Sequence, residues 1–340
     1  MSDVVRRFTL YRIKNLDRAE QEYYRTLQRT LDKIEDDVVK LAGRELPTQQ
    51  GKLIELQAAV AIRPKIRNIL SKEYLSWADS VTRKGFNQQA KRVERGFKAI
   101  LERARKENKV SAADLAKFSE LTKGDLELVQ NLKLQTFTQF KDISNTFTKR
   151  LSDKVYQNVL TGRDFVELEE ELRRTINGIY SKTDDEEAQK LVDFVKKNKN
   201  VKSMQSRVDK AIATLQSKFG RDRAGENMRR YSSQLLNDGL REFDAQVNTK
   251  KALDAGLTHV KYFGDIIPTT RQICRDLINR NIGSRNGLFT IDEVRRLWSR
   301  RSWSGKKSGD PLVVRGGYNC RHQWTYVNPD WYDNKGNLII

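Results

Sequence analysis

The sequence predicts a mainly α-helical protein with long helices in its N-terminal two-thirds and a small α+β domain at its C-terminal end. The first observation is the distribution of proline: only Pro47 and Pro64 precede residue 260, and residues 65–267 contain none. Because proline breaks helices, this interval favours long helices. The second observation is a change of composition near residue 256, beyond which lie four of the five tryptophans and every cysteine and histidine.

An apolar seam with heptad spacing predicts the first long helix. Its members follow one another at intervals of three and four residues: Tyr24, Leu27, Leu31, Ile34, Val38 and Leu41. Such a stripe is typical of a helix packed in a core, so we expect it to pack within the chain, with contact to a partner helix as the alternative. The segment GRELPTQQG, residues 43–51, ends this helix.

Further stripes predict the helices that follow. One begins after Pro64 and contains Ile66, Ile69, Leu70, Tyr74, Trp77 and Val81. Another contains Ile143, Phe147, Leu151, Val155 and Leu160, and a third contains Phe165, Leu168, Leu172 and Ile176. Between the last two, Gly162 is expected to cap one helix and Asp164 to open the next. The acidic residues of SKTDDEEAQK, residues 181–190, indicate one more helix start.

We expect three regions: helical regions over residues 1–110 and 111–250, and the α+β domain over residues 251–340. The third region begins with GLTHVKYFGD, residues 256–265, in which His259, Lys261 and Phe263 alternate with Val260 and Tyr262. This alternation between two glycines predicts a strand.

The balance of charge indicates a polyanionic partner. The chain has 65 Lys and Arg against 45 Asp and Glu, a formal net charge of +20. Non-specific binding to double-stranded DNA fits this excess, and a soluble helical protein with solvated basic faces is the alternative. No apolar run is long enough for a membrane span and the first residues lack a signal-peptide pattern, so we expect a cytoplasmic protein without a membrane partner.

The segment EVRRLWSRRSWSGKKSGDP, residues 293–311, is the strongest candidate for phosphate contact. Its cationic residues are interleaved with Trp298 and Trp303. The predicted phosphate contacts are Arg295, Arg296, Arg300, Arg301, Lys306 and Lys307. In the alternative, the tryptophans anchor a helix to the domain while the basic side faces water.

The four cysteine and histidine residues form the candidate site. His259, Cys274, Cys320 and His322 are the whole complement of both residue types. Two thiolates and two imidazoles are one ligand set for structural zinc, although no Cys-x-x-Cys or His-x-x-x-His pair occurs. The alternative is a pair of buried thiols with hydrogen-bonded histidines. A Cys-His nucleophile pair oriented by Asp265 is a weaker hypothesis, and no phosphate-binding glycine motif is present.

The C-terminal stretches KALDAGLTHVKYFGD, DIIPTTRQICRDL and GGYNCRHQWTYV resemble the phage head morphogenesis family, typified by the F protein of phage Mu. Cys274 falls in the family's cysteine-containing turn, and Cys320 falls in its closing Asn-Cys-Arg motif. With the helices that precede them, the resemblance covers residues 137–328. The chain departs from the pattern where it has Arg271 and Gly317 in place of a cysteine and a histidine, and where it has His322 in place of the last cysteine.

The resemblance implies a minor capsid protein of a tailed phage. Such a protein would associate with the portal protein and the major capsid protein inside the head, lie against packaged DNA, and act in head assembly and in DNA packaging or ejection. It would occupy the host cytoplasm during assembly and the virion afterwards. The rival hypothesis is a nuclease or toxin-like effector carried in the virion, with Asp265, Cys320 and His322 at its centre.

Overall fold

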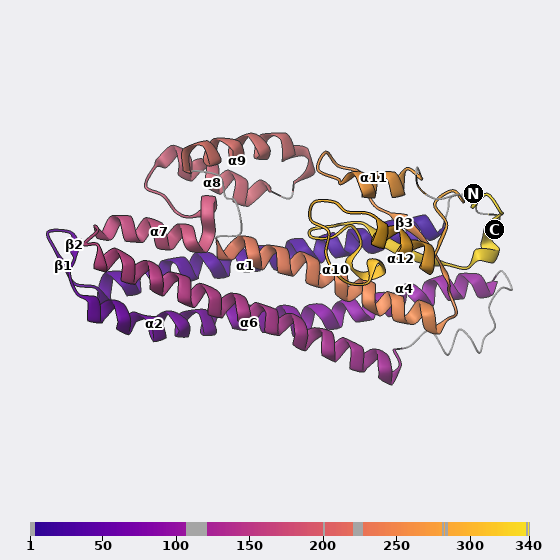
Figure 1. Ribbon diagram of the computed structural model, residues 1–340, viewed down its shortest axis with the longest axis horizontal. Helices are drawn as coiled ribbons and strands as arrows, with labels where there is room; N and C mark the ends of the chain where they lie inside the picture. The colour runs from indigo at the N-terminus through magenta and orange to yellow at the C-terminus, as the bar shows by residue number, and fades with distance from the viewer. Residues whose placement is uncertain are drawn as a thin grey trace. The chain divides into compact units, whose positions relative to one another are not determined.

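The computed structural model describes residues 4–106, 121–199, 201–219, 227–280, 282, 285–337 and 339. It confirms the predicted class, because long helices form the N-terminal part of the chain and a small region with a few strands forms the C-terminal part (Figure 1). The expected boundary between residues 110 and 111 lies outside the described residues.

The helices before residue 255 are α1 (Val4–Glu45), α2 (Leu56–Leu70), α3 (Ser76–Ser80), α4 (Phe86–Lys106), α6 (Lys123–Leu160), α7 (Phe165–Asn177), α8 (Glu186–Asn198), α9 (Gln205–Phe219) and α10 (Met228–Asp254). Short helical stretches of other types between them are η1 (Ser71–Leu75), η2 (Val81–Gly85), η3 (Gly178–Tyr180) and η4 (Lys202–Met204). A small hairpin after α1 consists of β1 (Thr48–Gln49) and β2 (Lys52–Leu53). The C-terminal elements are β3 (His259–Phe263), α11 (Gln272–Ile278), β4 (Phe289–Thr290), α12 (Ile291–Arg300), α13 (Pro311–Val314), β5 (Gln323–Val327) and η5 (Pro329–Trp331).

The chain forms two compact units that interleave along the sequence. The sheet unit consists of Met1–Glu20, Thr82–Gln135 and Asn237–Ile340, and the helical unit consists of Gln21–Val81 and Thr136–Leu236. Helices α1, α6 and α10 each contribute residues to both units. A helix of 42 residues such as α1 spans roughly 60 Å, which is more than one small core requires. For this reason the units do not follow the three consecutive ranges expected from composition.

The heptad seam on α1 packs within the chain. Leu27, Leu31, Ile34 and Val38 are fully buried, and Tyr24 and Leu41 are also buried. The stripe that follows lies on α2, η1 and α3, where Tyr74 and Trp77 contact the ring of Phe140 on α6. The predicted intramolecular packing of these stripes is therefore confirmed.

Two details of the helical unit differ from the sequence prediction. Helix α2 begins at Leu56 and carries Pro64 on an exposed position inside it, so the helix does not start after this proline. The α6 stripe ends on buried Val159, whereas Leu160 is 62% exposed. The reason is helical geometry: a step of four residues from Val155 stays on the buried face, and a step of five leaves it.

The predicted helix boundaries around residue 162 and residue 185 are confirmed. Gly162 has φ +60° and its N–H donates to the carbonyl of Val159, closing the last turn of α6. Asp164 stands in extended conformation directly before α7. The side chain of Asp185 accepts a hydrogen bond from the N–H of Ala188 and caps α8. Helices α8 and α9 then pack on each other around a separate apolar cluster (Figure 1).

The sheet unit contains an antiparallel three-stranded sheet in the order β4-β3-β5. The predicted strand at residue 259 is its central strand, β3, and all five residues of β3 pair with β5, from His259 opposite Val327 to Phe263 opposite Gln323. Every residue of β5 is buried. In the described part of the chain, no helix has both the length and the apolar character needed to cross a membrane.

Candidate functional site

A tight turn between α13 and β5 positions the closing motif. Arg315, Gly317 and Asn319 all have positive φ angles, of 55°, 96° and 58°. The N–H of Cys320 donates to the carbonyl of Gly317, and the N–H of Asn319 donates to the carboxylate of Asp238 on α10. The turn is thereby anchored to a helix, and Cys320 points into the interior.

The two glycines of the motif are required by close packing. A Cβ atom on Gly316 would overlap Cys274 Sγ and lie 3.0 Å from Cys320 Sγ, and the Gly316 N–H donates to Cys320 Sγ at 3.3 Å. A Cβ atom on Gly317 would overlap the carbonyl oxygen of Gly305. The Gly-Gly pair therefore allows the turn to close over both sulfur atoms and against residues 293–311, which we call the basic segment.

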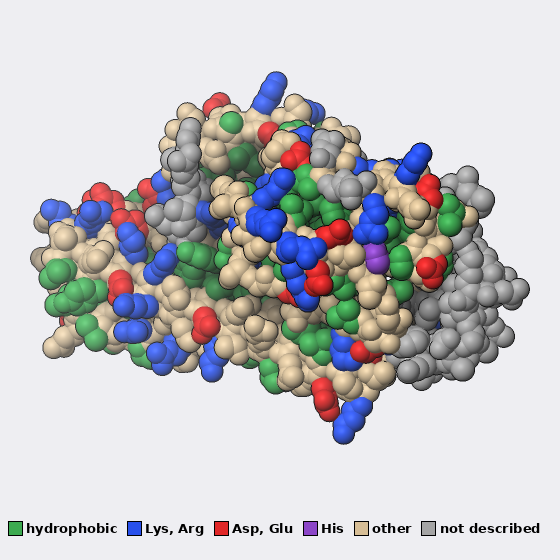
Figure 2. Space-filling view, turned by 45° about the vertical axis from the view of Figure 1, so that its right-hand side comes forward, with side chains coloured by type: hydrophobic (Ala, Val, Ile, Leu, Met, Phe, Trp, Pro, Cys, Tyr) green, Lys and Arg blue, Asp and Glu red, His purple; other side chains and the backbone are tan. Residues whose placement is uncertain are grey.

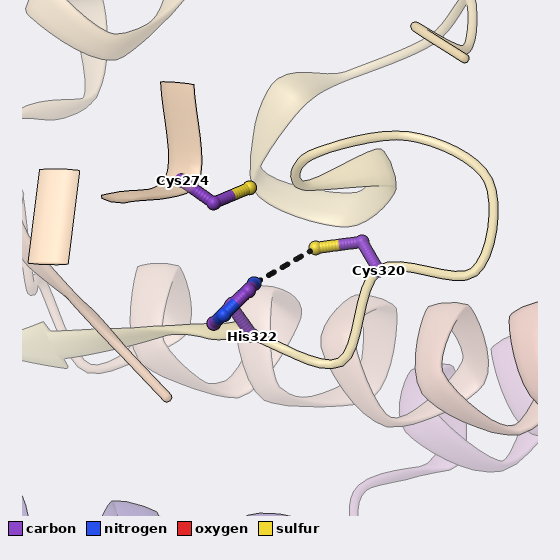
Figure 3. A group of neighbouring side chains, drawn as sticks. All are labelled: Cys274, Cys320 and His322. Atoms are coloured by element: carbon purple, nitrogen blue, oxygen red, sulfur yellow. Dashed lines mark hydrogen bonds between the residues drawn. The ribbon is translucent and has the colours of Figure 1, made fainter. Parts of the chain in front are cut away.

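Cys274, Cys320 and His322 meet in the interior of the sheet unit (Figure 3). Cys274 comes from α11, whereas Cys320 and His322 precede β5. All three are buried, and their sulfur and nitrogen ligand atoms lie within 4.8 Å of one another. The hydroxyl of Tyr262 on β3 lies 3.3 Å from Cys320 Sγ and 3.6 Å from Cys274 Sγ. We call these four residues the thiol cluster.

Hydrogen bonding fixes the orientation of the His322 ring. Its Nε2 lies 3.1 Å from the main-chain carbonyl oxygen of Asp265, which can only accept, so Nε2 carries a hydrogen. Its Nδ1 lies 3.5 Å from Cys320 Sγ. A Cβ atom on Gly264 would overlap the imidazole, so glycine at that position leaves room for the ring. The second ring nitrogen is thus directed at the sulfur atoms.

The electrostatic environment favours a thiolate at Cys320. Donation from the Cys274 thiol lowers the pKa of Cys320 well below its usual value, burial opposes this, and His322 and Arg315 lower the pKa further. The same hydrogen bond and burial raise the pKa of Cys274. Within the pair, Cys320 is therefore the more acidic thiol.

Arg315 supplies a buried positive charge near this thiolate. The residue is completely buried, and only its Nη1 is bonded, to the carbonyl of Val313. Its Nε and Nη2 have no hydrogen-bond partner among the described residues. A guanidinium does not lose its proton in a protein, so burial of the Arg315 charge is unfavourable by itself. Ionisation of Cys320 would offset part of this cost, and for the same reason Arg315 lowers the pKa of Cys320.

The thiol cluster has donors that suit zinc. Two cysteine sulfurs and one imidazole nitrogen are a ligand set that zinc takes with a fourth ligand from outside the protein. The His322 Nε2–H bond to a main-chain carbonyl is the arrangement that orients metal-bound histidines. Cys274, Cys320 and His322 would be the ligands.

His259 does not join them. It lies at the far end of β3, four residues or about 13 Å from Phe263, and its Nδ1 is 3.0 Å from Thr258 Oγ1. Burial and the nearby charge of Arg285 lower the pKa of this histidine. The structure therefore brings together three of the four residues that the sequence suggested as ligands.

Two positions that differ from the pattern of the resembled family, Arg271 and Gly317, hold the basic segment in place. Arg271 donates from Nε to the carbonyl of Ser304 and from Nη2 to the carbonyl of Tyr318. Gly317 packs directly on Gly305. These two positions thus join the segment to the turn.

The combination of Asp265, Cys320 and His322 does not form a nucleophile, base and orienting carboxylate. Asp265 is exposed, and its contact with His322 is made by its main-chain carbonyl. In the described residues, the imidazole therefore has no carboxylate on its Nε2 side.

The basic segment contains two kinds of cation. Arg295 pairs with Asp310 at 3.3 Å, Lys307 pairs with Glu242 at 2.5 Å, and Lys306 donates to the carbonyls of Trp298 and Arg301. We call Arg295, Lys306 and Lys307 the held cations. The remaining three are exposed and form no ion pair with a described residue; these free cations are Arg296, Arg300 and Arg301.

Trp298 of the segment is buried inside the unit, and the half-buried Trp303 packs against it. Trp298 is 4% exposed and makes an edge-on contact with Trp303, whose Nε1–H donates to the carbonyl of Gly316. They anchor the segment, which agrees with the alternative suggested by the sequence. In the space-filling view, Lys and Arg side chains form small groups with Asp and Glu among them (Figure 2).

Sequence reasoning did not identify three residues of the site. In the sequence, Tyr262 is one residue of a predicted strand, and nothing assigns a role to Arg315 or Gly316. The adjacent glycines beside a lone cysteine were the one available indication of close packing.

Comparisons with protein-family models, with curated proteins and with solved structures gave no match for the chain.

Proposed function

We propose that the chain is a minor capsid protein of a tailed phage, which associates with the portal inside the head and lies against packaged DNA. The observation that carries the proposal is the thiol cluster. Cys274 and Cys320 are 46 positions apart, yet the stretches that resemble the head morphogenesis family meet around one buried group. The fold thus brings together the two cysteine-containing stretches on which the resemblance rests.

In this proposal the thiol cluster is structural. It ties α11, the turn and β5 together from the inside, and its burial keeps the thiols away from substrates. A zinc ion held by Cys274, Cys320 and His322 would add to that connection. The chemistry supplied by the unit is then binding rather than turnover.

In this proposal the free cations contact the phosphates of DNA. A cation already engaged with a carboxylate or carbonyl must break that contact to reach a phosphate, whereas an exposed arginine does not. The net charge of +20 supplies general attraction, and Arg296, Arg300 and Arg301 supply direct contact.

A salt titration tests the DNA contact. Binding of a fluorescent 30-base-pair duplex is measured from low to moderate KCl for the wild type and for the triple variant Arg296→Gln, Arg300→Gln, Arg301→Gln. Because each phosphate contact contributes about 0.9 to the slope of log K against log salt, we expect the slope to fall by between about 2 and 3. The matched control replaces Arg295, Lys306 and Lys307 by Gln and should change the slope by less than about 1. An unchanged slope in the first variant would contradict the assignment.

Capture from a culture in which the phage assembles tests the location. The tagged chain is recovered at moderate salt from lysed cells and from purified virions, and bound proteins are identified by mass spectrometry. Recovery of portal and major capsid protein, with the chain present in virions, is the expected result. Absence of the chain from virions would overturn the proposal.

A further inference from the structure

The central strand of the sheet has an incomplete partner on one side. Strand β5 pairs with β3 along all five residues, whereas β4 pairs only with His259 and Val260. From Lys261 onward, no described strand pairs with the edge of β3 on the β4 side. Open strand edges are sites where another extended chain can add by main-chain hydrogen bonds.

The main chain of Tyr262 is directed toward this open edge. The Ile291 N–H donates to the carbonyl of Thr258, so the main-chain carbonyl of Thr258 points to the side of β3 on which β4 lies. The main-chain N–H and C=O groups of successive residues point to opposite sides of a strand, so those of Val260 and Tyr262 point to the β4 side as well. The carbonyl of Trp324, opposite Tyr262, agrees with this alternation, since it accepts from Arg12 rather than from β3. One donor and one acceptor at Tyr262 are thus presented to the gap.

The chain before β4 turns away from β3 for a local reason. Asn286 and Gly287 have φ angles of +47° and +72°, and the Leu288 N–H donates back to the carbonyl of Arg285. Residues in this left-handed region cannot continue a strand. The partner strand therefore begins only at Phe289, and no residue in the described part of the chain pairs with the β4 side of the main chain at Tyr262 or Gly264.

A cavity of about 350 Å³ occupies this gap. Lys261, Tyr262 and Phe263 of β3 line it, together with Gly264 and Asp265, which follow the strand. Leu277 and Ile278 of α11 line it, as does Leu10 of α1, so side chains of an added strand would meet apolar surface.

The charge of the cavity favours an acidic occupant. Arg6, Lys261 and Arg280 line it, and Asp265 is the one acidic residue among the lining residues. The Lys261 ammonium is turned toward the carbonyl of Gly336, and Arg280 is held beside the cavity by a 2.6 Å bond from Nη1 to Asn286. Cations beside an open strand edge complement a strand that carries carboxylates.

We propose that this cavity binds an extended acidic peptide segment of a partner protein, which adds to β3 as a strand beside Tyr262. The Tyr262 N–H donates to a peptide carbonyl, the Tyr262 carbonyl accepts from a peptide N–H, and the arginines meet acidic side chains at the ends of the segment. The inference rests on the open edge and the cavity, and it does not depend on the proposed function.

Fluorescence polarisation with the full chain tests this inference. The labelled probe is acetyl-Glu-Val-Thr-Val-Glu-amide, and three relatives are compared with it: one N-methylated at the central Thr, one N-methylated at both Val residues, and one with Lys in place of Glu. Since alternate N–H groups of a strand face opposite ways, one of the two methylated peptides should bind about tenfold more weakly and the other nearly as well as the parent. The Lys peptide should bind at least about tenfold more weakly.

Three results would overturn the inference. Equal binding by both methylated peptides and the parent would exclude strand addition, and equal binding by the Lys peptide would exclude selection by charge. Failure of the parent peptide to bind would also overturn it.

Variants of the protein locate the site. The double variant Arg6→Glu, Arg280→Glu should bind the acidic probe about tenfold more weakly, while the matched double variant Lys91→Glu, Arg95→Glu, which reverses two exposed cations on α4 away from the cavity, should leave binding unchanged. Circular dichroism of both variants confirms that the fold is retained. Equal loss in both variants would show general attraction to a basic protein and would contradict a site at this edge.

Discussion

The helical unit and the sheet unit bury charged side chains to different extents. The core of the helical unit is built on apolar stripes, with Leu27, Leu31 and Ile34 completely buried along α1. The sheet unit buries more charged side chains: Arg12 pairs with Asp244 in its interior, and Arg241 is buried and pairs with the half-buried Asp17. Among the described residues of the helical unit, the charged side chains that are buried to this extent are Glu35 and Arg229. Burial of charge requires every partner to be placed correctly, whereas an apolar stripe needs only the right spacing. The two units therefore differ in how far their interiors can be inferred from periodicity.

The largest expected effect is loss of an apolar side chain from the helical unit. Leu31→Ala removes three carbons from a completely buried position, and we expect it to lower the free energy of unfolding by about 2–5 kcal/mol. Leu160→Ala is the matched control, because the same atoms are lost from a side chain that is 62% exposed, and it should cost less than about 0.5 kcal/mol. Urea denaturation followed by circular dichroism measures both. Equal effects of the two variants would show that the seam does not form the core.

The next prediction compares the same Gly→Ala change at two positions of the sheet unit, one where close contact decides its effect on stability and one where helix propensity decides it. Gly316→Ala places a methyl group against both cysteine sulfurs, and we expect a loss of about 1–3 kcal/mol in stability. Gly124→Ala is the matched control, because Gly124 lies in α6 and its Cβ would make ordinary contacts, with the Lys250 side chain at 3.6 Å and with Thr122 Oγ1 at 4.0 Å. This change should stabilise the protein by up to about 1 kcal/mol.

The same chemical change should thus have opposite signs at the two positions. Thermal unfolding of each variant against the wild type measures this. Stability gained by Gly316→Ala would mean that the turn does not lie against the sulfur atoms.

This comparison also shows how much the sequence predicts. The helices and their buried stripes follow from repeated spacing, so Tyr24 to Leu41 were placed correctly. The thiol cluster depends on which turns approach which helix, and for this reason Cys274, Cys320 and His322 converge while His259 does not. Spacing carries no information on that convergence. The sequence also does not show which basic residues are engaged. Lys306 donates to main-chain carbonyls, whereas Arg300 is exposed, and their positions in the sequence do not distinguish the two.

The smallest expected effect concerns the polar end of the apolar seam. The hydroxyl of Tyr24 accepts from Lys199 Nζ at 3.1 Å, from Arg229 Nε at 3.1 Å and from Arg229 Nη2 at 3.0 Å. Burial opposes ionisation of this phenol, but the charges and hydrogen bonds of Arg229 and Lys199 outweigh it and lower the pKa of Tyr24 to about 8. Three donors on one oxygen favour the phenolate.

Ultraviolet titration of the folded protein should therefore show one phenol ionising near pH 8, and Tyr24→Phe should remove this step. Since the folded pKa lies below the unfolded value, the ionisation adds stability as pH rises from about 8 to 10, and this gain is lost as pH falls through 8. Tyr74→Phe is the control, because burial raises the pKa of Tyr74 and its removal leaves the step at pH 8 intact. If the step at pH 8 persists in Tyr24→Phe, it belongs to another phenol, and the charges of Arg229 and Lys199 do not lower the pKa of Tyr24 to that value.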